Sequence, residues 1–163
     1  MTLTTLKKKY TIAPPEDNSV FEKPKKFKAK SLIVVAEDEE FWKEEIVNTL
    51  REVFGDSVEI YATDTYTEAL DKIKANIHRL CGVVSDVNYY EKPDSQYTER
   101  CGLWLSSDLH SLAPPIPIIL ESNADYSSHI HNPKREAFIL KKDIKEKGPE
   151  LFRRMFRVKD LQQ

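Results

Sequence analysis

The sequence contains few cysteines and no long apolar run. Cys81 and Cys101 are the only two cysteines among its 163 residues, too few for a disulfide framework, and they fit a reducing compartment. No run of about 18 apolar residues could cross a membrane, and the N-terminus lacks the apolar core of a signal peptide. We therefore expect a cytoplasmic protein with no membrane contact.

The length and composition indicate one soluble domain. The chain is too short for two domains of ordinary size. Its residues are 40% hydrophobic and 32% charged, which is typical of a globular protein.

Charge divides the chain into a basic arm and an acidic body. Residues 1–30 hold eight lysines and three acidic residues, a net charge of +5, which leaves −7 for the remainder. We expect this arm to be irregular, because its apolar residues follow no period. Clustered lysines could contact nucleic acid, but a solvated tail or a strap on the acidic body is the favoured interpretation. The body spans residues 31–158, and residues 159–163 form a short tail.

Within the body, apolar segments alternate between the patterns of strands and helices. β-Branched runs predict five strands, and amphipathic spacing predicts helices between them. The expected strands are Leu32–Ala36, Val58–Ala62, Cys81–Ser85, Ile116–Leu120 and Ala137–Leu140. The expected helices cover 41–54, a segment opened by the capping box Thr65-Tyr66-Thr67-Glu68, 102–112, and a terminal segment with Pro149 at its first position. This alternation predicts an α/β three-layer sandwich, in which helices cover both faces of a five-stranded parallel sheet.

Polar side chains follow the predicted strands at their carboxyl ends, where ligands bind in such folds. They are Glu37 and Asp38 after the first strand, Asp86 after the third, Ser122 after the fourth and Lys141 after the fifth. Carboxylates that lie close together raise each other's pKa, and a divalent cation removes that conflict. Oxygen ligands favour magnesium over zinc.

In this order and at these spacings, the motifs resemble those of the receiver domain of bacterial response regulators. The resemblance covers residues 31 to about 158 and rests on Val35-Ala36-Glu37-Asp38-Glu39, Asp86, the run from Pro117 to Ser122, and Phe138-Ile139-Leu140-Lys141. It implies a flavodoxin-like fold with strand order 2-1-3-4-5. The protein would then act as a stand-alone receiver.

The resemblance also implies a role for each site residue. Asp86 is the expected phosphoacceptor, assisted by Lys141 and Ser122, and Phe138 is the expected switch residue. Magnesium would be held by Glu37, Asp38, Asp86 and the backbone carbonyl of Asn88. The expected partners are a histidine kinase or histidine phosphotransfer protein and a downstream protein target, with a homodimer as a further option. Such a protein is no enzyme beyond accepting its own phosphoryl group.

Departures from the family pattern leave a second function open. Fifteen residues separate Asp86 from Gly102, a longer loop than usual, and Asn123 stands where a small residue is common. The alternative is a pseudo-receiver, an interaction module that works without phosphorylation. A magnesium-dependent phosphatase is disfavoured, because Asp86-Val87-Asn88 lacks the second carboxylate that would act as the acid. The polar segment 125–133 gives little support for a fourth helix.

Overall fold

A computed structural model describes residues 29–94, 97–98, 100–112 and 114–158. Residues 1–28 of the predicted basic arm and the predicted tail 159–163 lie outside the described residues.

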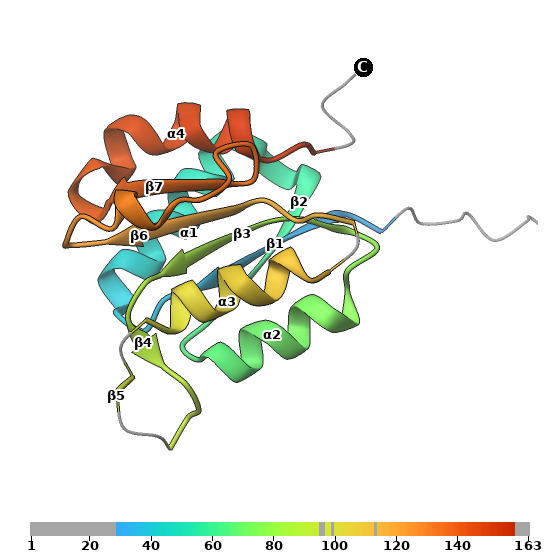
Figure 1. Cartoon of the computed structure of the whole chain (residues 1–163). Helices are drawn as coiled ribbons and strands as arrows, with labels where there is room; N and C mark the ends of the chain where they lie inside the picture. The colour runs from blue at the N-terminus through green and yellow to red at the C-terminus, as the bar shows by residue number, and fades with distance from the viewer. Residues whose placement is uncertain (1–28, 95–96, 99, 113, 159–163) are drawn as a thin grey trace, which may run out of the picture.

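Five parallel strands form the central sheet (Figure 1) in the order β2-β1-β3-β6-β7. This is the predicted order 2-1-3-4-5, because β4 and β5 belong to a separate two-stranded sheet. The parallel α/β sandwich is therefore confirmed. The strands are β1 (Ser31–Ala36), β2 (Val58–Thr63), β3 (Leu80–Asp86), β6 (Ile118–Ser122) and β7 (Glu136–Leu140).

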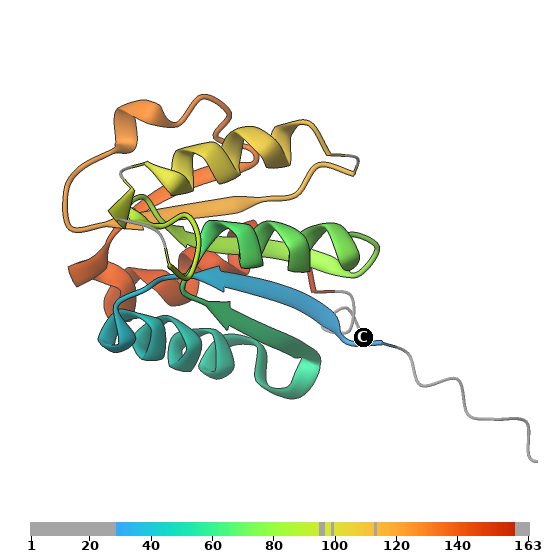
Figure 2. The ribbon, with the colours of Figure 1, turned by 90° about the horizontal axis from the view of Figure 1, so that it is seen from below.

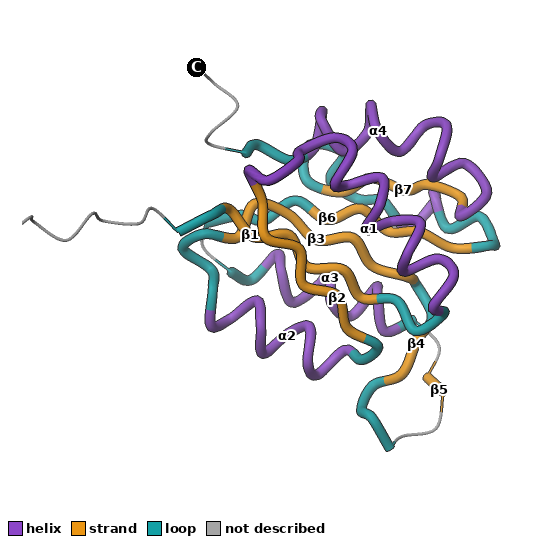
Figure 3. Tube along the Cα trace, turned by 180° about the vertical axis from the view of Figure 1, so that it is seen from behind, coloured by secondary structure: helices purple, strands orange, loops and turns teal. Residues whose placement is uncertain are grey.

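Two helices cover each face of the sheet, as the view from behind shows (Figure 3). One apolar cluster joins the sheet to α2 and α3, and a second joins it to α1 and α4. All six residues of β1 are buried, because this strand lies between two neighbours and under helices on both faces. The helices are α1 (Glu40–Phe54), α2 (Tyr66–Ala75), α3 (Cys101–His110) and α4 (Ile144–Met155).

Local sequence signals determine where two of the helices begin or end. Thr65 precedes α2, and its side chain accepts a hydrogen bond from the backbone N–H of Glu68, which is one half of the predicted capping box. The Glu68 carboxylate accepts a hydrogen bond from the hydroxyl of Thr63, and the backbone N–H of Thr65 donates to that hydroxyl. Gly55 follows α1 with φ 54°, a conformation that favours glycine.

The terminal helix begins earlier than predicted. Pro149 was expected at its first position, but α4 starts at Ile144 and contains Pro149 in its interior. The ring removes one intrahelical hydrogen bond, and burial of Ile144, Leu151 and Phe152 against the sheet compensates for it. The fourth predicted strand is also displaced: β6 begins after Pro117 and ends at Ser122, because its pairing with β7 continues to Leu140.

Between β6 and β7 the structure has only the short 3-10 turn η2 (Ser127–His129) in place of an α-helix. Buried Glu136 holds this connection. Its Oε2 accepts 2.8 Å hydrogen bonds from the backbone N–H groups of His131 and Asn132, and its Oε1 accepts one of 2.6 Å from Ser106 of α3. One carboxylate thus binds the loop to the neighbouring helix.

The long loop after β3 forms a hairpin of β4 (Tyr89–Tyr90) and β5 (Tyr97–Thr98). It is anchored beside α2, because Tyr90 bridges Thr65 and the N–H of Thr67 donates to the carbonyl of Glu91 at 3.0 Å. In Figure 1 the hairpin projects from the edge of the sheet where the strands end.

Both ends of the described chain lie at the opposite edge, where β1 begins (Figure 2). Among the described residues, no helix is long and apolar enough to span a membrane.

Candidate functional site

The predicted acidic residues meet at the carboxyl edge of the sheet. Ala36 of β1 pairs with Ser85 of β3, so the two strands end at the same level. Glu37 therefore follows β1 beside Asp86, the last residue of β3 rather than the first residue after it. Glu37 is fully buried and Asp86 is 4% exposed.

Lys141 reaches this cluster from the end of β7. Its side chain is 1% exposed, and its Nζ lies 2.7 Å from Oε2 of Glu37 and 2.9 Å from Oδ2 of Asp86. Glu39 supplies a third carboxylate at 3.0 Å. Burial alone would lower the pKa of Lys141, but the surrounding carboxylates, Glu121 first among them, raise it above its usual value. The lysine is a fixed cation in a site with more negative than positive groups.

Glu121 is a buried residue of this site that the sequence interpretation did not assign. It is fully buried, pairs with Asp86 in the sheet register, and places Oε2 3.9 Å from Nζ of Lys141. Within the described part of the chain, neither of its carboxylate oxygens has a hydrogen-bond partner. A lone acidic residue in an otherwise apolar central strand was the signal that could have identified it, because buried carboxylates are rare.

Burial shifts the pKa of three carboxyl groups upward. Desolvation, followed by the charge of Glu37, raises the pKa of Asp86 to about 6, and the same two causes raise that of Asp38 to about 6. Desolvation and then Glu37 also raise the pKa of Glu121 well above its ordinary value. Clustered, desolvated carboxyl groups favour the neutral form unless a cation is present.

The donor set fits a magnesium ion. Glu37, Asp38 and Asp86 each offer an oxygen, and these oxygens lie within 4.8 Å of one another. Oε2 of Glu37 is buried without a hydrogen-bond donor among the described residues, although it forms the ion pair with Lys141. Oxygen-only ligands with this surplus of negative charge suit a hard divalent cation.

Backbone contacts hold the end of β3 in place. A Cβ atom on Gly102 would lie 2.1 Å from the carbonyl oxygen of Asp86, so only glycine permits this approach of α3. The N–H of Gly102 donates to the carbonyl of Val87, and the N–H of Asn88 donates to Oδ1 of Asp86 at 3.1 Å. The hairpin loop is closed at its base by a 2.8 Å bond from the N–H of Arg100 to the side chain of Asn88.

The two remaining predicted residues lie on adjacent strands. Ser122 ends β6 and is 4% exposed, and its Oγ accepts a 3.4 Å hydrogen bond from the N–H of Ala124. Phe138 of β7 is half-buried against the apolar cluster beneath α2 and α3. A cavity of about 260 Å³ lies beside the acidic cluster, with Asp38 and the hairpin residues Tyr90 and Pro93 in its wall.

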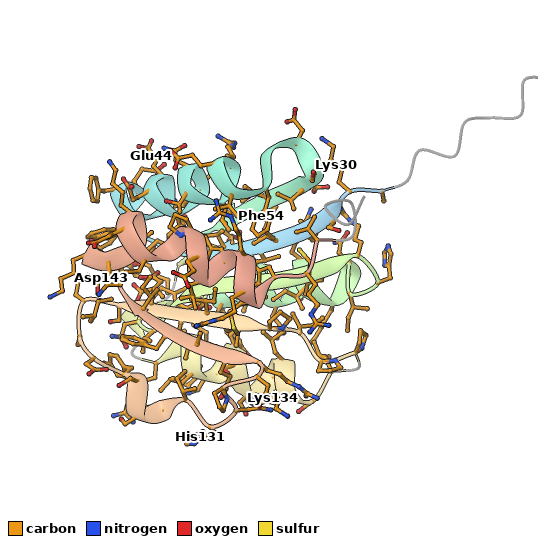
Figure 4. All side chains as sticks on the ribbon, turned by 90° about the horizontal axis from the view of Figure 1, so that it is seen from above. Lys30, Glu44, Phe54, His131, Lys134 and Asp143 are labelled. Carbon is orange, nitrogen blue, oxygen red and sulfur yellow. The ribbon has the colours of Figure 1, made fainter. Side chains whose placement is uncertain are left out.

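Two residues labelled in Figure 4 show where the two edges of the sheet lie. Asp143, two residues after Lys141, lies at the edge where the strands end, and Lys30 lies at the opposite edge. Glu37, Asp38, Asp86 and Lys141 thus lie together at one edge of the sheet, and Ser122 ends the neighbouring strand β6, whereas Phe138 lies within β7. The ligands and catalytic roles assigned to them stay predictions.

Solved structures similar to this chain are response-regulator receiver domains. The receiver domain of RcsB from Escherichia coli superposes with a TM-score of 0.57 at 13% identity, covering 75% of this chain and 89% of that one. A putative response regulator from Chloroflexus aurantiacus superposes with a TM-score of 0.55 at 18% sequence identity, and the match covers 78% of this chain and 98% of that one. The receiver domain of the putative response regulator NarL from Mycobacterium tuberculosis superposes with a TM-score of 0.52 at 22% sequence identity, and the match covers 77% of this chain and 98% of that one.

No family model matches the sequence, and no curated protein matches it. The structural likeness nevertheless defines the class of fold. The chain has the receiver-domain fold of response regulators.

Proposed function

We propose that the protein is a phosphoacceptor receiver of a two-component or phosphorelay system. Asp86 takes a phosphoryl group from a histidine kinase or a histidine phosphotransfer protein. The observation that carries the proposal is the buried ion pair between Lys141 and Asp86 beside Glu37 and Asp38.

In this reaction an oxygen of Asp86 attacks the phosphorus of a phosphohistidine, so a P–O bond forms as the P–N bond breaks and the imidazole leaves. Lys141 keeps the attacking carboxylate oriented, since its ammonium lies 2.9 Å from Oδ2. It then pairs with the negative charge of the phosphoryl group as a compact cation. Catalysis here is mostly positioning and charge stabilisation.

Magnesium, held by Glu37, Asp38, Asp86 and the carbonyl of Asn88, would offset charge on the phosphoryl oxygens. Ser122 hydrogen-bonds the new phosphoryl group, and Phe138 turns toward the space that Ser122 leaves. Such a change in β6 and β7 reaches the surface and alters contact with a protein target.

The experiment is to incubate the protein with magnesium and phosphoramidate and to measure its intact mass. We expect one added phosphoryl group, lost in Asp86→Asn and in the presence of EDTA. Asp108→Asn, which changes a carboxylate on α3 outside the site, is the control and should retain the adduct. An adduct that survives in Asp86→Asn would contradict the proposal.

A pseudo-receiver is the second candidate, and Glu121 favours it. Glu121 is a further buried carboxyl group, 3.9 Å from Nζ of Lys141, and in its ionised form it would repel an added phosphoryl group. If wild-type protein shows no adduct under conditions that phosphorylate another receiver, this second function is the one supported.

A further inference from the structure

The edge of the sheet opposite the acidic site contains a large cavity. Its volume is about 620 Å³, within the range of roughly 300–1,000 Å³ that is usual for small-molecule sites. Its walls come from the start of β1, the turn between α2 and β3, the segment before β6, the segment before β7 and the end of α4. All of these segments lie where the strands begin.

Cationic side chains line this cavity. Arg79, Lys134, Arg135 and Arg157 are basic lining residues, His78 lies beside them, and no described residue in the lining is acidic. The Arg79 guanidinium is held by Glu59 at 2.6 Å and by Asn76 at 2.9 Å.

Three of these cations have no ion-pair partner in the described part of the chain. No described carboxylate lies within 4.0 Å of the charged groups of Lys134, Arg135 or Arg157. Among the described residues their positive charge is thus not neutralised by a carboxylate, and a ligand with about three negative charges would balance it.

Apart from Ser31, the remaining lining is largely apolar. Ile77, Leu80, Ile116 and Met155 contribute aliphatic surface, and three prolines before β6 add a rigid wall. A concave apolar surface with a few charged groups suits a molecule with one flat hydrophobic part and one anionic part.

The charge of the N-terminal segment argues against its occupying the cavity. Residues 1–28, which directly precede the lining residue Ala29, hold seven lysines against three acidic residues. A lysine-rich segment is a poor occupant of a cationic cavity, whereas the same lysines would favour the approach of an anion.

From these features we propose that the cavity is a binding site for a nucleoside diphosphate. The phosphates contact Arg135, Lys134 and Arg157, and the base lies on the partly exposed apolar surface formed by Ile77 and Met155. Arginine forks match phosphate oxygens well, and a nucleoside diphosphate carries about three negative charges at neutral pH. This site is separate from the acidic cluster and requires no metal.

The test uses the full chain and ADP labelled on its ribose with a methylanthraniloyl fluorophore, titrated in EDTA so that the carboxylate site binds no metal. We expect saturable binding that unlabelled ADP displaces. Arg135→Glu should weaken binding by about tenfold or more, since it replaces a charge-assisted contact with a repulsive one. Lys145→Glu is the matched control: this exposed lysine near the start of α4 lies outside the cavity, so binding should change by less than about twofold.

Thermal melts show whether each variant is folded. If Arg135→Glu does not fold, Arg157→Glu tests the same loss of ADP binding. Adenosine and pyrophosphate are then tested as separate competitors, and each should displace the probe more weakly than ADP. Absence of saturable binding would overturn the proposal. Binding that Arg135→Glu and Arg157→Glu leave unchanged would also overturn it, as would displacement by a DNA oligonucleotide but not by ADP.

Discussion

Asp86 is held in surroundings that oppose its own charge. Its pKa of about 6 lies above the ordinary value of 3.8, so the folded state binds this proton more tightly than the unfolded state does. Folding stability from this group is therefore fully present below about pH 4 and is lost as the pH rises to about 6. Folding stability thus falls as the pH rises, whereas a carboxylate stabilised by a salt bridge alone would make it rise with pH.

We predict that, in EDTA, the free energy of unfolding of the wild type falls between pH 4 and pH 7. Asp86→Asn should remove only part of this slope, because Asp38 and Glu121 also have raised pKa values, and the variant should be more stable than the wild type at pH 7, by about 3 kcal/mol at most. Urea unfolding at a series of pH values measures the effect. A wild-type slope that Asp86→Asn leaves unchanged would show that another group causes it.

Gly102 controls the position of the Asp86 backbone. We expect Gly102→Ala to cost about 1–3 kcal/mol, because its Cβ would overlap the carbonyl oxygen of Asp86, a backbone atom that cannot move independently. Gly148→Ala in α4 is the control. A Cβ there meets its neighbours at 3.5 Å or more, so that variant should be neutral or slightly stabilised. Equal stability of the two variants in urea unfolding would refute this role for Gly102.

Some of the residues at this site could be placed from the sequence, and others could not. Glu37, Asp38, Asp86 and Lys141 could be placed at the site because each lies at the carboxyl end of a strand. Glu121 could be recognised as a lone acidic residue in an apolar strand, but its place beside Lys141 could not be predicted, because the direction of a side chain at a strand end depends on the sheet register and on the helix that covers it. The tight approach at Gly102 depends in the same way on how α3 packs against β3.

At the scale of the elements, the connection between β6 and β7 replaces a helix with a loop held by Glu136. Its hydrogen bonds with Ser106 and with two backbone N–H groups outweigh desolvation and lower the pKa of Glu136. His110 of α3 lies 3.2 Å from the same carboxylate. The loop is therefore coupled to α3 through one side chain.

We predict that Glu136→Ala destabilises the protein by about 2–4 kcal/mol, because two backbone N–H groups and Ser106 lose their acceptor. Glu150→Ala, a change at an exposed position of α4, should have an effect below about 0.5 kcal/mol. Hydrogen exchange gives a second measurement, in which Glu136→Ala should release the N–H groups of His131 and Asn132. Unchanged exchange there would exclude the coupling.

Strand and helix periodicity predicted the order of the elements but not all of their limits. Pro149, followed by Glu150 and by arginines in the last turn, suggested that α4 starts at Pro149, whereas burial of the preceding Ile144 extends that helix. The polar segment 125–133 gave little sign of a helix, and the structure has only the 3-10 turn η2 there and no α-helix. The hairpin was not foreseen, because its short strands become stable through pairing with each other and contact with α2.

For the whole molecule, the structure separates two kinds of charge at the two edges of one sheet. Carboxylates gather where the strands end, and cations line the cavity where they begin. The fold could be predicted from the sequence because a parallel sheet needs buried strands and alternating helices. The cationic cavity could not, because its residues come from five segments that are distant in the sequence.

Asp86 is the one carboxyl group, among several neighbouring ones, that we propose accepts the phosphoryl group. Borohydride reduces an acyl phosphate to an alcohol, which converts a phosphorylated aspartate into homoserine. Protein treated with phosphoramidate and magnesium should be reduced, digested and sequenced by tandem mass spectrometry. We expect homoserine at position 86 only. A reduced residue at Glu37, Asp38, Glu39 or Glu121 in place of Asp86 would contradict it.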